Sequence, residues 1–226
     1  MAEQLGFDLP SRPALERDAF FVSPANAVPL AMIDGWTGWR EGKLVLTGPK
    51  GSGKTHLAHV WAEMSGARII RASDLDEAMV PALASGPTAI EDVPAIAGDT
   101  PHETALFHLH NLARAEGQAL LFTGTGDVTT WGITLPDLLS RLQGATVAAL
   151  LPPDDQLLAA LLVKLFADRQ MTPRADLIPY LLGRMDRSFA ATIDLVQRLD
   201  AASIALKRPI TRQLAATVLD NPPAEA

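Results

Sequence analysis

One stretch decides the fold of this chain: Leu44-Val45-Leu46-Thr47-Gly48-Pro49-Lys50-Gly51-Ser52-Gly53-Lys54-Thr55. Residues 48–55 match the phosphate-binding loop pattern G-x-x-x-x-G-K-[ST]. An apolar strand precedes the loop and a helical pattern over residues 56–65 follows it, which is the context that the motif needs. Glycines let successive N–H groups converge on one anion, and the helix N-terminus adds its positive dipole. A surface Gly-Lys turn is the alternative, but the strand-to-helix context favours nucleotide binding.

The loop predicts a site for ADP or ATP with Mg²⁺. Lys54 has the length and charge to reach the outer phosphates, and the Thr55 hydroxyl is a ligand of the kind that Mg²⁺ accepts. We therefore assign the whole loop to nucleotide binding: Gly48, Pro49, Lys50, Gly51, Ser52, Gly53, Lys54 and Thr55.

Composition narrows the class of protein. The chain has 226 residues, no cysteine and a net charge of −7. The lack of cysteine excludes disulfide scaffolds and thiolate metal sites, and it fits a reducing compartment. We expect a cytoplasmic protein with no membrane association, because no basic-then-apolar leader opens the chain and no apolar run approaches the length of a span. The acidic balance argues against direct, sequence-specific DNA binding, which depends strongly on Lys and Arg.

The order of apolar patterns predicts two structural parts. Strands alternate with helical segments up to residue 151, which favours an α/β fold with a parallel sheet and helices on both faces. We expect strands at 44–47, 67–71, 88–93, 119–125 and 146–151, with Ser73 and Asp74 capping a short helix. After Pro152 and Pro153 only amphipathic helices follow, at 154–167, 174–185, 188–206 and 211–219. The expected organisation is a flexible tail (1–13), a nucleotide-binding base (14–152) opened by a helical lead-in (14–42), a small all-helical lid (153–220) and a disordered end (221–226).

Polar residues at the ends of two later strands are candidates for catalysis. Glu91 and Asp92 end the strand at 88–93, beside the expected phosphate loop, where carboxylates hold Mg²⁺ or orient a water. We assign Glu91 to the metal as well. Thr123 and Thr125 end the next strand, and each either contacts the nucleotide or satisfies a turn.

Other side chains are open to two readings. Arg141 lies on an amphipathic helical pattern, so it is either a solvated arginine or one that reaches the γ-phosphate of a neighbouring subunit. The histidines lack metal-ligand spacing, so we expect His102, His108 and His110 at the surface or its boundary. The tryptophans at 36, 39, 61 and 131 are expected to be packing residues.

The first residues of the chain include an apolar strip. Gln4, Leu5, Phe7 and Leu9 either enter a groove on a partner protein or fold back on their own domain.

Over about residues 18–220, the chain resembles the DnaA-related AAA+ ATPases, and among them the Hda-like regulatory inactivators of DnaA. The likeness is carried by the lead-in segment 21–27, the Walker A and B elements at 48–55 and 89–93, residues 96–99, the sensor 1 strand at 121–125, the arginine-finger segment at 135–142 and the lid helix at 199–205. Residues 4–9 are similar to the peptide with which replication proteins dock on the DNA polymerase sliding clamp. The residues after the expected lid are too few for DnaA's helix-turn-helix domain.

The resemblance implies a mechanism and several partners. A clamp-bound, nucleotide-bound protein would meet ATP-loaded DnaA, and Arg141 would complete the DnaA active site and promote hydrolysis. This would prevent replication from re-initiating. Asn26 would lie at the adenine side of the nucleotide. Whether a homodimer also forms stays open.

The chain departs from the family pattern at three positions. The first alters the expected metal geometry, and the other two lower the expected autonomous ATPase activity. Walker B reads Glu91-Asp92 where the family has Asp first. Ala190 stands where the sensor 2 arginine is expected, with Arg187 about one turn away as a substitute. Thr125 stands where an acid is common at sensor 1.

Two further classes compete with this reading. A P-loop phosphotransferase would consume ATP rapidly without a protein partner. An ATPase of the helicase-loader type would bind single-stranded DNA in a salt-sensitive way.

Overall fold

The centre of the protein is a parallel sheet. The computed structural model describes residues 22–221, and among them five strands pair in the order β2-β3-β4-β1-β5. The strands are β1 (Lys43–Thr47), β2 (Arg68–Arg71), β3 (Thr88–Glu91), β4 (Leu120–Gly124) and β5 (Thr146–Ala149). Every pairing is parallel. The carboxyl ends of all these strands therefore meet at one edge of the sheet, where a ligand site is expected in an α/β fold.

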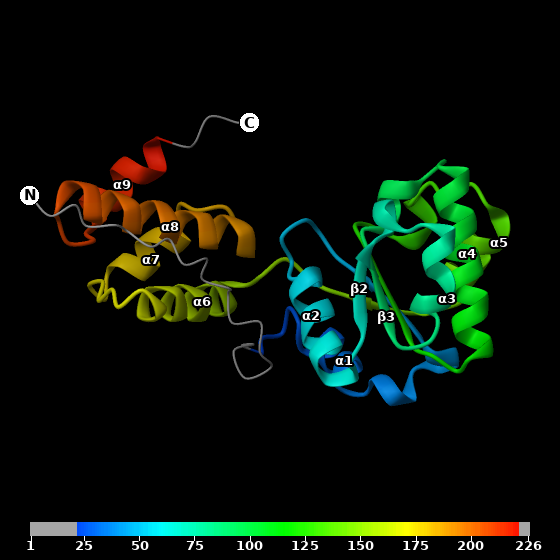
Figure 1. Ribbon diagram of the computed structural model, residues 1–226. Coiled ribbons are helices and arrows are strands. Elements are labelled where there is room, and N and C mark those ends of the chain that lie inside the picture. The colour runs from blue at the N-terminus through cyan, green and yellow to red at the C-terminus, as the bar shows by residue number, and fades with distance from the viewer. Residues whose placement is uncertain (1–21, 222–226) are drawn as a thin grey trace, which may run out of the picture.

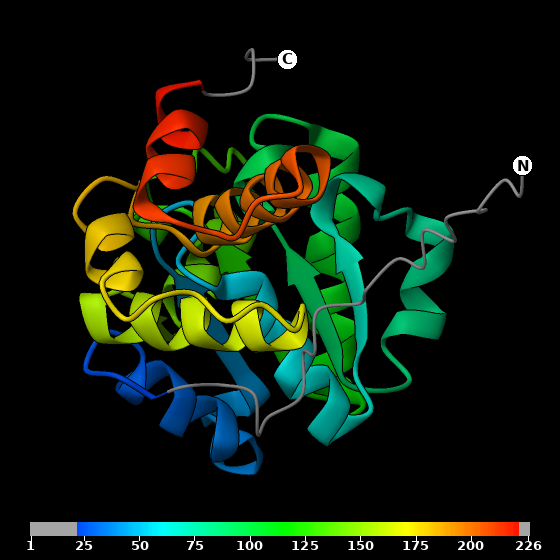
Figure 2. The same cartoon turned by 90° about the vertical axis from the view of Figure 1, so that its left-hand side faces the viewer.

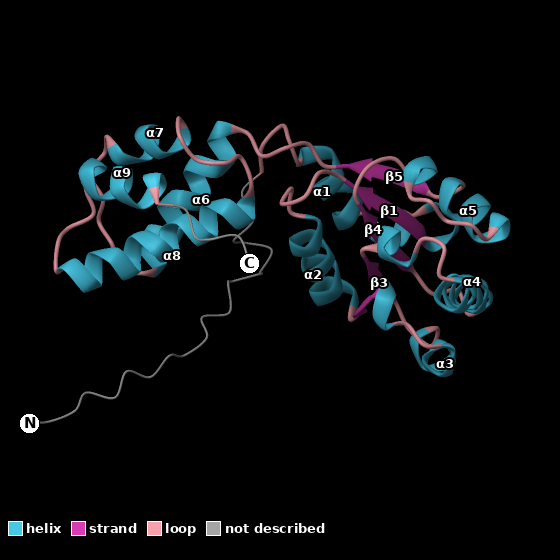
Figure 3. Ribbon diagram, turned by 90° about the horizontal axis from the view of Figure 1, so that it is seen from above, coloured by secondary structure: helices cyan, strands magenta, loops and turns pink. Residues whose placement is uncertain are grey.

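Helices cover both faces of the sheet (Figure 3). α1 (Ala27–Asp34) and α2 (Lys54–Ser65) lie on one face, and α3 (Val80–Leu83), α4 (Thr100–Ala115) and α5 (Pro136–Gln143) lie on the other. Side chains alternate between the two faces, as strand geometry requires. Leu44 and Leu46 pack with α1 and α2, whereas Val45 packs with α3, α4 and α5. β1 is buried throughout because both of its faces are covered.

A bundle of helices follows β5 and lies beyond the α1–α2 face (Figures 1 and 2). It comprises α6 (Asp155–Asp168), α7 (Leu177–Leu182), α8 (Phe189–Leu206) and α9 (Arg212–Asp220). Its buried residues, among them Leu162, Phe166 and Leu199, form a core of their own. The side chains of Asp154, Ser188 and Thr211 cap the N-termini of α6, α8 and α9. The predicted fold class, a parallel α/β sheet followed by an all-helical part, is thus confirmed.

Some predicted boundaries were wrong. The third strand ends at Glu91, because Asp92 takes a left-handed conformation (φ 55°) and residues 93–96 form a 3-10 helix. Asp76 caps the segment that leads into α3, where Ser73 and Asp74 were expected to act, since its carboxylate accepts from the Ala78 amide. Within the described part of the lead-in, α1 begins only at Ala27 and two 3-10 turns follow it.

Candidate phosphate-loop site

The phosphate loop connects β1 to α2 at the carboxyl edge of the sheet. Gly53 is the N-cap of α2 with φ of 98°, a left-handed conformation that favours glycine. The Ser52 amide donates to the Pro49 carbonyl at 3.2 Å. The Ser52 hydroxyl is buried and has no hydrogen-bond partner in the described structure. A buried polar atom without a partner is rare, so a ligand or water is expected beside it.

Lys54 is held against its own loop. Its ammonium Nζ donates to the carbonyls of Gly48 at 2.7 Å and Pro49 at 2.9 Å. Burial lowers the pKa of Lys54, and the charge of Asp92 acts in the opposite direction. Asp92, at the end of β3, is thus close enough to act on the charge of Lys54.

The acidic pair Glu91 and Asp92 lies at the carboxyl end of β3, and β4 lies between β3 and β1. The Asp92 amide donates to the Thr123 hydroxyl at 3.1 Å, which joins the two neighbouring strand ends. One carboxylate oxygen of Glu91, Oε1, is buried and has no hydrogen-bond partner among the described residues. Asp92 is exposed. Of the two threonines at the end of β4, Thr123 is buried and contacts this pair, whereas Thr125 is exposed.

These residues fit a nucleotide carrying Mg²⁺. Thr55 presents an exposed hydroxyl at the first turn of α2, and Glu91 has an oxygen without a partner. Within residues 22–221, no group of three histidine, aspartate or glutamate side chains is arranged to hold a metal ion by itself. Mg²⁺ is commonly bound by one or two protein oxygens together with nucleotide phosphates, and this donor set agrees with that.

The bundle reaches the phosphate loop through the N-terminus of α8. The Phe189 amide donates to the Gly51 carbonyl at 3.0 Å. A Cβ atom at Gly51 would lie 2.6 Å from Ser188 Cβ, and one at Gly53 would lie 3.2 Å from the Phe189 ring. Both glycines are thus needed for close approach as well as for backbone conformation. The first residues of α8 cover the loop with an aromatic ring and a hydroxyl.

The basic residue at this end of α8, Arg187, bonds to a carboxylate of the bundle and not to the phosphate loop. Ala190 is exposed and carries no charge. Arg187 forms an ion pair with Asp155 on α6, with a separation of 2.8 Å between Nη2 and Oδ1. Both side chains are more than half exposed. In this conformation the guanidinium of Arg187 is paired within the bundle.

The lead-in segment lies beside the end of β5. The Leu151 amide donates to the Ala25 carbonyl at 3.2 Å. Asn26 is buried, and its side-chain oxygen accepts from the Ser23 amide at 2.9 Å. The predicted contact between Asn26 and the nucleotide stays a prediction, as do those of Pro49 and Lys50, which are exposed in the loop.

Arg141 lies on α5, on the face of the sheet remote from the bundle. It is exposed, while its neighbours Leu138 and Leu142 are buried in the core with α4. It pairs with no carboxylate among residues 22–221. The sheet and the α1–α2 layer separate α5 from the bundle (Figures 1 and 3). The other predicted partner-binding residues (Gln4, Leu5, Phe7 and Leu9) lie outside the described residues.

The sequence correctly predicted the packing role of the tryptophans. Trp39 stacks on Trp61 with 5.1 Å between ring centroids, Trp36 meets Trp61 edge-on, and Trp131 is buried.

The expectation for His110 was wrong, because it lies on the face of α4 that packs on the sheet and is only 1% exposed.

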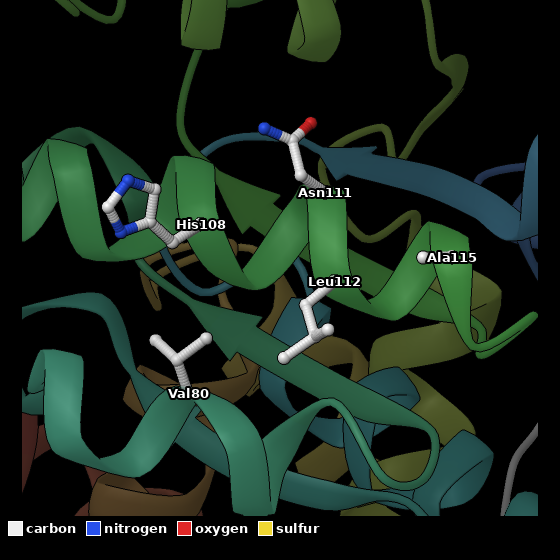
Figure 4. A pocket seen from close by; sticks show the side chains of 5 residues that line it. All are labelled: Val80, His108, Asn111, Leu112 and Ala115. Atoms are coloured by element: carbon white, nitrogen blue, oxygen red, sulfur yellow. The ribbon is translucent and has the colours of Figure 1, made fainter.

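A hollow on the α3–α4 side is separate from the phosphate loop. It has a volume of about 400 Å³, and the side chains of Val80 and Leu112 face each other across it (Figure 4). His108, Asn111 and Ala115 complete its lining. None of these residues belongs to the predicted nucleotide site.

Comparison with known proteins identifies the fold. No protein-family model matches the chain. Domain III of the Thermotoga maritima replication initiation protein DnaA superposes with a TM-score of 0.80 at 18% identity, over 94% of this chain and 98% of that domain. The chain has the AAA+ fold.

Longer relatives of this fold match over part of their length. AMPPCP-bound DnaA from Aquifex aeolicus gives a TM-score of 0.64 at 19% identity, over 79% of this chain and 62% of the other. The Thermotoga maritima RuvB branch migration motor gives 0.65 at 16% identity, over 86% and 65%. This AAA+ chain therefore spans a little under two thirds of those proteins. Among its described residues, no helix is long and apolar enough to cross a membrane.

Proposed function

We propose that this protein is a nucleotide-bound AAA+ regulator that stimulates hydrolysis of ATP bound to a DnaA-type initiator, and that it does so while attached to the sliding clamp. The observation that carries the proposal is the place of Arg141. It is an exposed arginine without a carboxylate partner in the described structure, on an AAA+ base that superposes well on DnaA domain III.

Arg141 is suited to act on another molecule. The sheet and the α1–α2 layer stand between α5 and the bundle that covers the chain's own phosphate loop. An arginine that stabilises charge in phosphoryl transfer acts either in cis or in trans. The position of α5 on the outer face favours the second mode.

Nucleotide binding is supported by the atoms around the phosphate loop. Lys54, Thr55 and Glu91 supply the donors and acceptors that a Mg²⁺-nucleotide needs, and two DnaA relatives are described as bound to AMPPCP. Hydrolysis by the chain alone is expected to be weak. Ala190 offers no charge near the outer phosphate, and Arg187 is paired with Asp155.

The deciding experiment measures hydrolysis of ATP on DnaA with and without DNA-loaded clamp. We expect the wild-type protein to accelerate it and Arg141→Ala to lose at least 90% of the stimulation, since a finger arginine contributes about 10³–10⁵-fold in characterised cases. Arg114→Ala, which removes an exposed arginine from α4, is the matched control. Full stimulation by Arg141→Ala refutes the role of that arginine.

The clamp attachment is tested separately. Replacing Leu5 and Phe7 together by alanine should remove binding to the clamp and leave nucleotide affinity unchanged. Clamp binding that persists in the double variant contradicts the tail's proposed role. Salt-sensitive binding of single-stranded DNA would instead favour a loader-type function, and rapid ATP consumption by the chain alone would favour a phosphotransferase.

A further inference from the structure

α5 lacks a cap of its own. Its N-cap residue is Leu135, whose side chain cannot accept a hydrogen bond. The first amides of a helix have no partner within it, so they bond to water or to an acceptor from elsewhere in the protein. The acceptor here is Glu103, which lies in the first turn of α4.

The Glu103 carboxylate is fully buried and binds three segments together. Oε2 accepts from the Leu135 amide at 2.6 Å, from the Thr134 hydroxyl at 2.9 Å and from the Thr134 amide at 3.1 Å. Oε1 accepts from the Gly98 amide at 2.8 Å and from the Thr134 amide at 3.0 Å. Glu103 is 0% exposed, and among the described residues no lysine, arginine or histidine forms an ion pair with it.

The charge is stabilised without a cation. The carboxylate lies in the first turn of α4 and at the N-terminus of α5, where helix dipoles favour an anion. Burial by itself would raise the pKa of Glu103, but hydrogen bonds from Thr134, Gly98 and Leu135 outweigh burial and lower it. Hydrogen bonds to a carboxylate are roughly twice as strong as those between neutral groups.

The segments that Glu103 bonds are continuous with two candidate functional sites, the acidic end of β3 and Arg141 on α5. Gly98 follows the acidic end of β3 by way of the 3-10 helix at residues 93–96. Leu135 precedes Arg141 by six residues, about 9 Å along the α5 axis at 1.5 Å per residue. Leu138 and Leu142 pack α5 on the core, with Leu135 and Leu139 partly buried beside them, and Glu103 bonds the backbone at the N-terminus of the helix.

We propose that Glu103 is a positioning residue that fixes the N-terminus of α5, and with it Arg141, against the segment that follows the acidic end of β3. The role of Arg141 in this inference rests on the proposed function. The anchoring of α5 does not, and it can be measured on the protein alone.

The test replaces Glu103 by glutamine, which has nearly the same shape. The glutamine NH₂ group would face amide donors where the carboxylate accepted from them. We expect amide hydrogen exchange at Gly98, Thr134 and Leu135 to accelerate at least tenfold, with exchange in β1 and β4 unchanged. Stimulation of DnaA-bound ATP hydrolysis should fall at least tenfold at saturating protein, because a displacement of about 1 Å can cost about 10²-fold. Nucleotide affinity and the half-saturating concentration should stay within twofold.

Glu116→Gln, an exposed change near the other end of α4, is the matched control and should alter neither readout. If E103Q does not fold, Thr134→Val removes only the hydroxyl bond to Oε2 and should shift both readouts in the same direction to a smaller extent. Unchanged exchange at the three amides, or equal acceleration throughout the protein, overturns the anchoring. Local acceleration with undiminished stimulation overturns the link to Arg141. A wild-type protein that never stimulates DnaA refutes the proposed function, while the exchange data still decide the anchoring.

Discussion

Among single residues, the candidate phosphate site contains two buried oxygen atoms without hydrogen-bond partners in the described structure. It also contains an ammonium group that bonds to carbonyls of its own loop. The Ser52 hydroxyl and Glu91 Oε1 are buried without a partner in the described structure. Lys54 instead bonds the loop carbonyls of Gly48 and Pro49. Phosphate oxygens would compete for that ammonium, so Lys54 is the residue whose loss should affect nucleotide binding most.

Lys54→Ala should weaken ADP and ATP binding at least tenfold, since a hydrogen bond to a charged group contributes about 1.5–3 kcal/mol. Isothermal titration calorimetry measures the change. Arg174→Ala, which removes one exposed positive charge in the bundle, serves as the control. Equal affinities in the wild type and in Lys54→Ala would exclude the loop as the phosphate site.

Because His110 is buried, we expect the free energy of unfolding to depend on pH. Burial, together with the charges of Lys43, Arg141 and Arg114, lowers the pKa of His110 from 6.5 to about 4, against the opposing hydrogen bond with Asn111. The unfolded chain therefore binds a proton before the folded protein does. The free energy of unfolding is highest above pH 6.5, falls as the pH drops towards 4, and loses about 3 kcal/mol through this group.

Urea denaturation at several pH values measures this effect. In His110→Leu, the loss between pH 6.5 and 4 should shrink by about that amount. Val163→Ala, which changes a half-exposed side chain without a titratable group, supplies the control and should keep the wild-type profile. A His110→Leu profile parallel to that of the wild type would show that His110 does not stay neutral in the fold.

At the scale of elements, helix N-termini connect the parts of the molecule. Ser188 is the N-cap of α8: its hydroxyl accepts from the Ala191 amide at 3.0 Å, and the same turn packs on Gly51. α5 has no such residue of its own and uses Glu103. Capping thus joins the bundle to the phosphate loop in one case and α5 to α4 in the other.

Ser188→Ala should lower the free energy of unfolding of the bundle by about 1 kcal/mol, because the Ala191 amide loses its acceptor. Amide exchange along α8 detects the loss. Ser73→Ala removes an exposed hydroxyl that bonds the neighbouring Asp74, and it should have a much smaller effect. If both variants changed exchange in α8 equally, the cap would not be the cause.

At the scale of the whole molecule, the α/β part and the bundle have separate cores. The bundle covers the phosphate loop on one side, and α5 presents Arg141 on the other. The phosphate loop at the carboxyl edge of the sheet and the exposed Arg141 on α5 are thus separate sites, as the proposed action of Arg141 on a second molecule requires.

Phe166→Ala should destabilise the bundle by about 3–5 kcal/mol, since Phe166 is almost fully buried there. Amide exchange in α6–α9 should accelerate strongly, while exchange in β1 and β4 stays the same. Val163→Ala changes a half-exposed side chain on the same helix and is the control. Equal acceleration in both parts would mean that they unfold as one unit.

Elements whose signals lie in contiguous residues could be predicted from the sequence. The phosphate loop follows from residues that are contiguous in the chain. The strands follow from short apolar runs, and the helices follow from an apolar period of 3.6. The alternation of these elements predicted a parallel α/β sheet, which places the loop and the acids of β3 at the same edge.

Contacts between residues far apart in the chain could not be predicted and depend on how the elements pack. Glu103 and Leu135 are 32 residues apart, and no local pattern marks a glutamate as the cap of another helix. The bond from Asp92 to Thr123, the burial of His110 and the seat of Phe189 on Gly53 likewise depend on packing between elements. The physical reason is that hydrogen bonds and close contacts are short-ranged, whereas the residues that make them are brought together only when the whole core is assembled.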